Sequence, residues 1–152
     1  YNINIIQNIL AKNDEERCPI IYNRSNYGSD NKKYISKKKD DEYKYQIVHT
    51  IPQKGVRYIY SKINNKGHFG ISKVIFGDNG FNDAIIDIDG NFGMSENSMA
   101  IKIENLSDGN NIQRALTSNK FKNIIKSCII GNFRIDWRLF NDFKKDFWKE
   151  FI

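Results

Sequence analysis

The fold is decided by the stretch between Lys66 and Asn105, which reads Lys66-Gly-His-Phe-Gly-Ile-Ser-Lys-Val-Ile-Phe-Gly-Asp78, then Ala84-Ile-Ile-Asp-Ile-Asp-Gly-Asn-Phe-Gly-Met94, then Ser98-Met-Ala-Ile-Lys-Ile-Glu-Asn105. Its three short apolar runs are separated by Gly, Asn, Asp and Ser; they are Val74–Phe76, Ala84–Ile88 and Met99–Ile103. This spacing predicts three consecutive β-strands joined by tight turns, in a meander.

Two more strands are predicted upstream of this stretch. Tyr43–Thr50 alternates in hydrophobicity, and Val56–Lys62 is its predicted partner across the turn Pro52–Gly55. The polar segment between them and the N-terminus, Asn23–Asp41, is predicted to be a long loop.

Helical periodicity replaces strand patterning after Asn105. We expect a short helix capped by Asp108 or Asn110, and a second helix capped by Ser118. A terminal helix capped by Asp136 would carry an aromatic stripe on one side, made of Trp137, Phe140, Phe143, Phe147 and Phe151.

Together with an amphipathic N-terminal helix over Ile3–Leu10, these elements predict an α+β fold. We expect a twisted, mainly antiparallel sheet with helices packed at one side and a helical C-terminal half. No repeat or linker divides the sequence, so residues 1–152 are predicted to form a single domain. Because the chain starts at Tyr1 without an initiator Met, we expect it to be a segment of a longer protein.

The chain is basic, with a formal net charge of +6 and a pI near 9.2. Such a charge favours nucleic acid first and an anionic membrane surface second, with plain solubility as the alternative. No apolar run approaches the ~20 residues that span a bilayer, so no membrane association is predicted. Cys18 and Cys128 lack metal-ligand spacing and indicate free thiols in a reducing, intracellular (cytoplasmic) compartment, with a disulfide as the alternative.

Basic residues interleaved with aromatics before residue 80 are the main candidate for a binding site. Lys and Arg neutralise phosphates, and polar or aromatic side chains in loops read base edges. The residues predicted to contact DNA are Arg24, Lys37, Lys38, Lys39, Arg57, Lys66, His68 and Lys73. The acidic run Asp40–Glu42 directly after the three lysines leaves a merely solvated loop as the alternative.

The sequence patterns that would indicate catalysis are weaker than those that indicate DNA binding. Asp87, Asp89 and Glu104 could supply carboxylates to a metal-dependent nuclease, with Lys102 beside them. We favour a turn at Asp89–Gly90 instead, and predict no metal site and no catalytic residue in this segment. A third possibility is a protein-interaction module that exposes the aromatic stripe of the last helix.

Three pieces of sequence carry a family resemblance: Lys73-Val-Ile-Phe, Ile86-Asp-Ile-Asp-Gly-Asn-Phe92 and Met99-Ala-Ile-Lys-Ile103, followed by Ala115-Leu-Thr-Ser-Asn-Lys-Phe121. In this order they resemble the target-recognition domain of adenine-specific DNA methyltransferases of restriction–modification systems. The similarity covers about half of the chain. Ser72 stands where that family commonly has Pro, and the N-terminal third of the chain has no recognisable counterpart.

The resemblance implies that this segment binds double-stranded DNA sequence-specifically and does not itself catalyse methyl transfer. The Asn/Asp-Pro-Pro-Tyr/Phe motif of such methyltransferases is absent, since Pro19 and Pro52 are the only prolines. The resemblance therefore implies a partner methyltransferase domain upstream that binds S-adenosylmethionine. No cofactor is expected in this segment.

Overall fold

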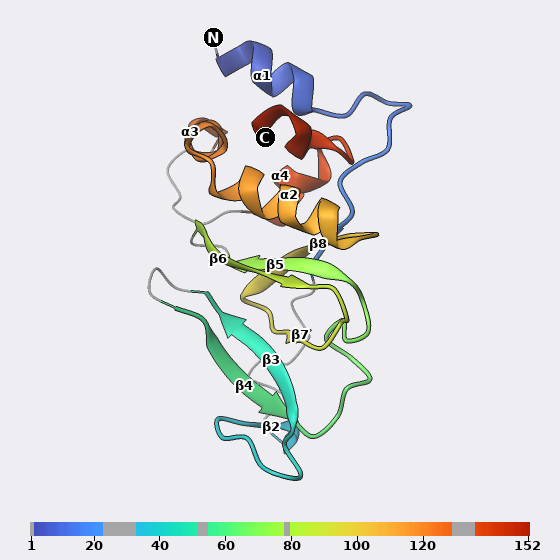
Figure 1. Ribbon diagram of the computed structural model, residues 1–152, viewed down its shortest axis with the longest axis vertical. Helices are drawn as coiled ribbons and strands as arrows, with labels where there is room; N and C mark the ends of the chain where they lie inside the picture. The colour runs from blue at the N-terminus through green and yellow to red at the C-terminus, as the bar shows by residue number, and fades with distance from the viewer. Residues whose placement is uncertain (1, 23–32, 52–54, 78–79, 129–135) are drawn as a thin grey trace.

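The computed structural model describes residues 2–22, 33–51, 55–77, 80–128 and 136–152. Two four-stranded sheets lie one below the other, and the helices gather on the outer side of the first sheet (Figure 1). The predicted α+β fold is confirmed, with the helices mostly in the C-terminal half. The strands, however, are divided between two sheets instead of forming one.

The sheet next to the helices, called here the helix-side sheet, is entirely antiparallel in the order β1-β8-β5-β6. Its strands are β1 (Ile20–Ile21), β5 (Lys73–Gly77), β6 (Gly80–Asp87) and β8 (Ser98–Lys102). The three strands predicted from the central stretch are therefore present. Their order is not that of a meander, because β5 lies between β6 and β8.

The second sheet, called the distal sheet, lies away from the helices (Figure 1) and has the order β2-β4-β3-β7. Its strands are β2 (Ile35–Ser36), β3 (Tyr45–Thr50), β4 (Arg57–Ser61) and β7 (Gly93–Met94). The predicted antiparallel pairing of β3 with β4 is confirmed, and β7 joins β3 in parallel. The chain thus leaves the helix-side sheet after β6, contributes β7 to the distal sheet, and returns as β8.

The helices are α1 (Asn2–Ile9), α2 (Leu106–Thr117), α3 (Asn119–Cys128), α4 (Trp137–Asn141) and the 3₁₀-helix η2 (Phe147–Phe151). The predicted caps of the helix after Asn105, Asp108 and Asn110, are wrong. Asn105 is the cap, because its Oδ1 accepts the Asp108 N–H at 2.8 Å. Ser118 does cap α3, since its Oγ accepts the Phe121 N–H at 3.2 Å.

The predicted continuous terminal helix is also wrong. Asp136 caps its start, but α4 ends after five residues and the chain then pairs with the segment that follows α1. Phe143 bridges Leu10 and Lys144 bridges Arg17 before η2 begins. These backbone bridges replace the helical hydrogen bonds, so the aromatic residues reach the core from two short helices and an extended link.

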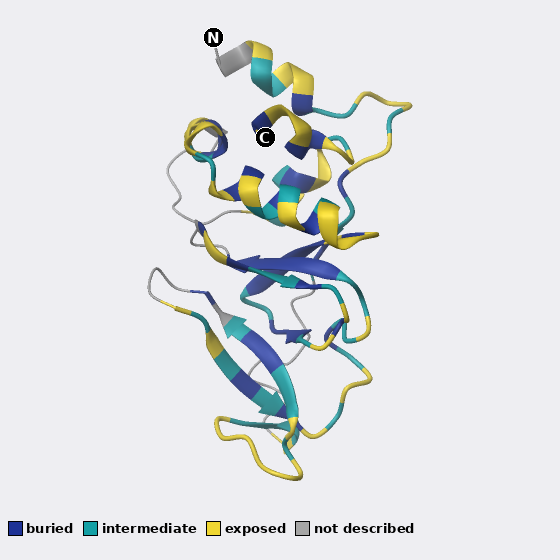
Figure 2. Cartoon of the chain, in the orientation of Figure 1, coloured by how far each residue is buried: buried dark blue, intermediate teal, exposed yellow. Residues whose placement is uncertain are grey.

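The largest core cluster fills the space between the helices and the helix-side sheet (Figure 2). It is aromatic: the Phe121 ring packs at a tilt against Phe140 and Phe147 and edge-on against Phe143, with ring centroids 5.7–6.3 Å apart. A second cluster between the two sheets contains Val48, Ile75, Met94 and Ala100, among others. In the parts of the chain that are described, no helix has both the length and the apolarity to cross a bilayer.

Candidate nucleic-acid interface

Charge is distributed unevenly between the two parts of the molecule. Between residues 33 and 71, which build the distal sheet and its loops, the described residues include eight basic side chains and three acidic ones. Elsewhere the described residues include twelve basic and thirteen acidic side chains. The positive excess therefore belongs to the distal sheet. Its basic residues are Lys33, Lys37, Lys38, Lys39, Lys44, Arg57, Lys62 and Lys66.

Lys37–Lys39 are exposed on the loop that joins β2 to β3, at the end of the molecule farthest from the helices (Figures 1 and 2). Asp40 directly follows these lysines and stabilises the turn at residues 40–43. Its Oδ1 accepts the N–H groups of Glu42 and Tyr43 at 2.9 and 2.6 Å. Glu42 lies 3.7 Å from Lys62. The acidic run thus shapes the loop that carries the three lysines.

Tyrosine rings accompany these lysines. Lys33 and Lys66 both lie over the Tyr34 ring, with Nζ 4.9 and 5.1 Å from its centroid. Lys44 lies over Tyr45 in the same way, at 5.4 Å. Each such contact orders an ammonium group by weak attraction to the ring face. The distal sheet therefore presents positive charge held against aromatic surface.

The remaining predicted surface contacts have different outcomes. Arg57 is exposed on β4, opposite Thr50, and Lys66 is half-buried in the loop after β4. Both belong to the same basic region as Lys37–Lys39. Arg24 lies outside the described residues.

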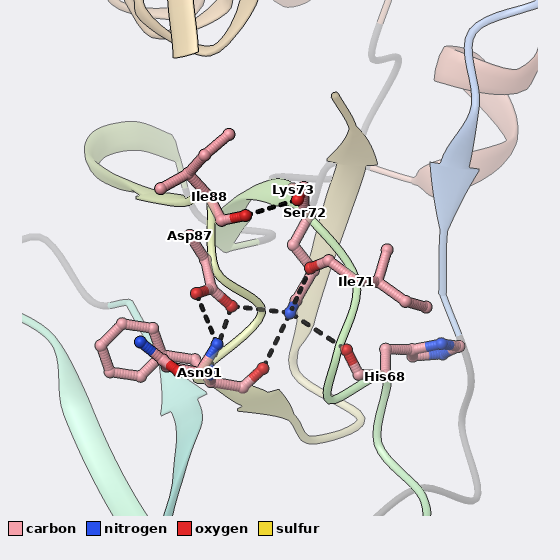
Figure 3. A network of polar contacts seen from close by, with 8 residues as sticks. His68, Ile71, Ser72, Lys73, Asp87, Ile88 and Asn91 are labelled. Carbon is pink, nitrogen blue, oxygen red and sulfur yellow. Dashed lines mark hydrogen bonds and ion pairs between the residues drawn. The ribbon is translucent and has the colours of Figure 1, made fainter. Parts of the chain in front are cut away.

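Lys73 does not fit the predicted role, because it is completely buried. Its Nζ lies 2.8 Å from Asp87 Oδ2 and donates to the carbonyls of Phe92 at 2.8 Å, His68 at 3.0 Å and Ile71 at 3.1 Å (Figure 3). Burial lowers the pKa of Lys73, while the hydrogen bond and the charge of Asp87 oppose that shift. The prediction that Lys73 contacts DNA is therefore corrected: its charge is used inside the protein.

Asp87 completes this network. Besides the ion pair, its carboxylate accepts the N–H groups of Asn91 at 2.8 Å and Phe92 at 3.0 Å (Figure 3). Gly90 makes the turn possible: its φ is +69°, and a Cβ there would lie 2.6 Å from Gly70. Ser72, at the position where the resembled family has Pro, donates from Oγ to the Ile88 carbonyl. The network thus fixes two of the connections between the sheets, the one from β4 to β5 and the one from β6 to β7.

His68 is strained and held inside. Its φ of +65° is unusual for a residue with a side chain, and its Nε2 is buried without a hydrogen-bond partner among the described residues. Burial lowers the pKa of His68, and the charges of Lys73 and Lys102 lower it further. A neutral ring with a buried Nε2 is a poor phosphate ligand, so His68 contributes to loop shape instead of to positive charge.

The three carboxylates considered for a nuclease are not gathered. Asp87 is committed to Lys73, Asp89 is exposed on the turn after β6, and Glu104 lies 3.4 Å from Lys145. The turn at residues 88–89 is present, but it leads from one sheet to the other and does not join paired strands. Among the residues that are described, no group of three or more His, Cys, Asp or Glu is placed to hold a metal ion.

The aromatic stripe does not form an exposed surface either. Phe140, Phe143 and Phe147 are at most 1% exposed, and Trp148 is 8% exposed. Trp148 lines an open groove of about 420 Å³ between β8, the start of α2 and the segment after α1. The rim of this groove carries both basic and acidic side chains, joined in ion pairs such as Lys144–Glu15 and Lys145–Glu16. Its charges therefore do not favour a polyanion.

Sequence reasoning missed a serine–histidine contact. Ser95 Oγ lies 3.2 Å from His49 Nδ1, which resembles the pairing of a nucleophile with its base. The same Oγ donates to the His49 carbonyl at 2.8 Å, and Ser95 is 2% exposed. With its proton engaged by the backbone and its oxygen buried, Ser95 ties β7 to β3 and is not placed as a nucleophile.

Sequence reasoning also missed a polar row on the distal sheet. The register places Ser36 opposite Tyr60 on one side and Gln46 opposite Tyr60 on the other. All three side chains are half-buried. The alternation of β3 and β4 was visible in the sequence, but which residues face one another becomes clear only from the pairing.

No family model matches this chain, and neither a curated protein nor a solved structure shows significant similarity to it.

Proposed function

We propose that this segment binds double-stranded DNA sequence-specifically, as the target-recognition part of an adenine-specific DNA methyltransferase or restriction–modification enzyme. The observation that carries the proposal is the concentration of positive charge on the distal sheet, while the rest of the described chain is close to neutral. A basic surface of this kind supplies the sequence-independent part of DNA affinity through phosphate contacts.

The buried network supports the family assignment in a second way. Lys73, Asp87, Gly90 and Phe92 are residues through which the chain resembles the target-recognition family, and they converge on one structural feature. Three of these residues have a physical reason for their identity: a buried cation, its counter-ion and a left-handed turn. Phe92 takes part through its backbone groups.

In the proposed mechanism, this segment positions the duplex and the upstream domain performs the chemistry. That domain would hold S-adenosylmethionine and take the target adenine out of the stack. The segment itself would supply DNA affinity and sequence preference. We propose that it does so as part of an intracellular protein.

The test is a fluorescence-anisotropy titration of the chain with a labelled duplex of mixed sequence at several salt concentrations. We expect binding that weakens steeply as salt rises, with a Kd for a non-cognate duplex between about 10⁻⁶ and 10⁻⁴ M at physiological salt. A binding curve that does not change with salt, or no binding in that range, would contradict the proposal.

A further inference from the structure

We infer that Gln46 and Tyr60, on neighbouring strands of the distal sheet, read base edges, while the surrounding lysines bind phosphates. This inference rests on the proposed function and divides the distal surface into a part that gives sequence preference and a part that gives affinity. The distinction matters because phosphate contacts position a protein on DNA without carrying sequence information.

The first observation is placement. Gln46 on β3 lies directly opposite Tyr60 on β4, and Ser36 on β2 lies opposite Tyr60 from the other side. Paired residues in a sheet have their side chains on the same face, about 5 Å apart. Three polar side chains from three adjacent strands therefore form a single row across the sheet.

The second observation is that two members of the row have no protein partner, whereas Ser36 Oγ accepts the Lys38 N–H at 3.1 Å. Neither the Gln46 amide nor the Tyr60 hydroxyl has a hydrogen-bond partner among the described residues, although both side chains are half-buried. Neither group is among the buried polar atoms that lack a partner, so both remain accessible to a ligand. Both side chains can donate and accept, and the glutamine amide matches the N6 and N7 edge of adenine in the major groove.

The third observation is the surroundings of the row. Lys44 and Lys62 are exposed just beyond the paired residues Tyr45 and Ser61, two positions from Gln46 and Tyr60 along their strands. On the opposite face of the same strands, Ile47 and Ile59 are buried together, covered by Ile63 and Phe69. On the face of the polar row, Val48 and Tyr58 pack into the cluster between the two sheets, so the row lies between that cluster and the exposed Lys44 and Lys62.

The experiment begins with selection of a preferred duplex from a randomised pool by the wild-type chain. The Kd values for that duplex and for a shuffled duplex of equal composition are then measured for Tyr60→Phe and Gln46→Ala. We expect the ratio of the two Kd values to fall about 5- to 150-fold, because one good base contact contributes that much discrimination. The salt dependence and the thermal midpoint should stay unchanged.

Tyr45→Phe is the matched control. Tyr45 is also half-buried on β3, but it packs edge-on against Phe69 on the opposite face, with the ring centroids 6.0 Å apart. Removing its hydroxyl should leave the ratio as it is. Lys44→Ala and Lys62→Ala should weaken binding to both duplexes equally and reduce the salt dependence.

The outcomes separate the two proposals. A wild-type chain that binds no duplex, or selects no sequence, contradicts the proposed function itself. A selective wild type whose preference survives both Tyr60→Phe and Gln46→Ala contradicts only the assignment of the polar row. That assignment is equally contradicted if Tyr45→Phe lowers the ratio as much as Tyr60→Phe does.

Discussion

The helix-side part of the molecule and the distal sheet differ in their aromatic residues and in their charge. Around the helix-side sheet, phenylalanines are buried and the described charges nearly balance. On the distal sheet, aromatic residues are mostly tyrosines near lysines, and positive charge dominates. Phenylalanine has only apolar surface to offer, whereas tyrosine keeps a polar end for solvent or a ligand. We therefore expect stability to depend mainly on the helix-side part and the proposed DNA binding to depend mainly on the distal sheet.

The largest expected effect lies at the junction of the two parts. Lys73→Met should lower the free energy of unfolding by about 3–5 kcal/mol, because it leaves the Asp87 charge buried without its partner. Three carbonyls would lose a donor as well. Urea denaturation followed by circular dichroism measures this change.

Lys102→Met is the matched control for this prediction. Lys102 lies opposite Lys73 in the register of β8 and β5, but it is exposed. Its replacement should change the free energy of unfolding by less than about 0.5 kcal/mol. Equal effects at the two positions would show that the buried network does not hold the two sheets together.

The next prediction separates binding from stability. Replacing Lys37, Lys38 and Lys39 together by Ser should make DNA binding less dependent on salt. If each lysine neutralises one phosphate, the wild type loses about 40-fold more affinity than the variant between about 50 and 200 mM salt. The thermal midpoint should hardly move, since these side chains are exposed. Anisotropy titrations at both salt concentrations measure the difference.

The control removes the same charge from the other part of the molecule. Lys120, Lys122 and Lys126 lie on α3, against the aromatic core. Replacing these three by Ser changes the net charge equally but should leave the salt dependence close to that of the wild type. If both triple variants respond alike, DNA affinity follows total charge, and the distal sheet has no special role.

The sequence predicts correctly those features of the fold that depend on residues close together in the chain. Gly and Asn around Val74–Phe76 marked the strand ends correctly, and Ser118 was identified as a cap because one helical turn settles that contact. The division into two sheets was missed, since it depends on pairings such as Ile47 with Gly93, far apart in the chain. A terminal helix was expected from aromatic spacing, yet tertiary bridges to Leu10 and Arg17 interrupt it.

The same limit applies to the site. In the sequence, Lys73 is indistinguishable from a lysine on the surface. Its burial becomes evident only from its contact with Asp87, fourteen residues later. Conversely, Gln46 and Tyr60 carry no motif, and their candidacy depends on cross-strand register. The basic character of residues 33–71 was readable directly from composition.

A smaller effect tests the helix-side part alone. Asn105→Ala should lower the free energy of unfolding by about 1 kcal/mol, because the Asp108 N–H loses its acceptor at the start of α2. Asn110→Ala, within the same helix and exposed, should stay within about 0.5 kcal/mol of the wild type. DNA affinity should be unchanged in both, as measured by the same titrations. A larger loss in Asn110→Ala would return the cap to the position that the sequence first suggested.

The smallest expected effect concerns His68 and acid. Because burial and the nearby lysines lower its pKa in the folded state, the unfolded chain binds a proton more readily than the folded chain just below pH 6.5. The contribution of His68 to stability is therefore present above pH 6.5 and is lost as pH falls toward the lowered pKa. His68→Asn removes this titration, and asparagine tolerates the left-handed φ of +65°. We expect the urea midpoint of the wild type, relative to the variant, to fall between pH 7 and pH 5 and to stay level above pH 7. A relative midpoint that rises in acid would instead mean that a protonated His68 is stabilised in the folded protein, and that the loop after β4 belongs to the charged surface of the distal sheet after all.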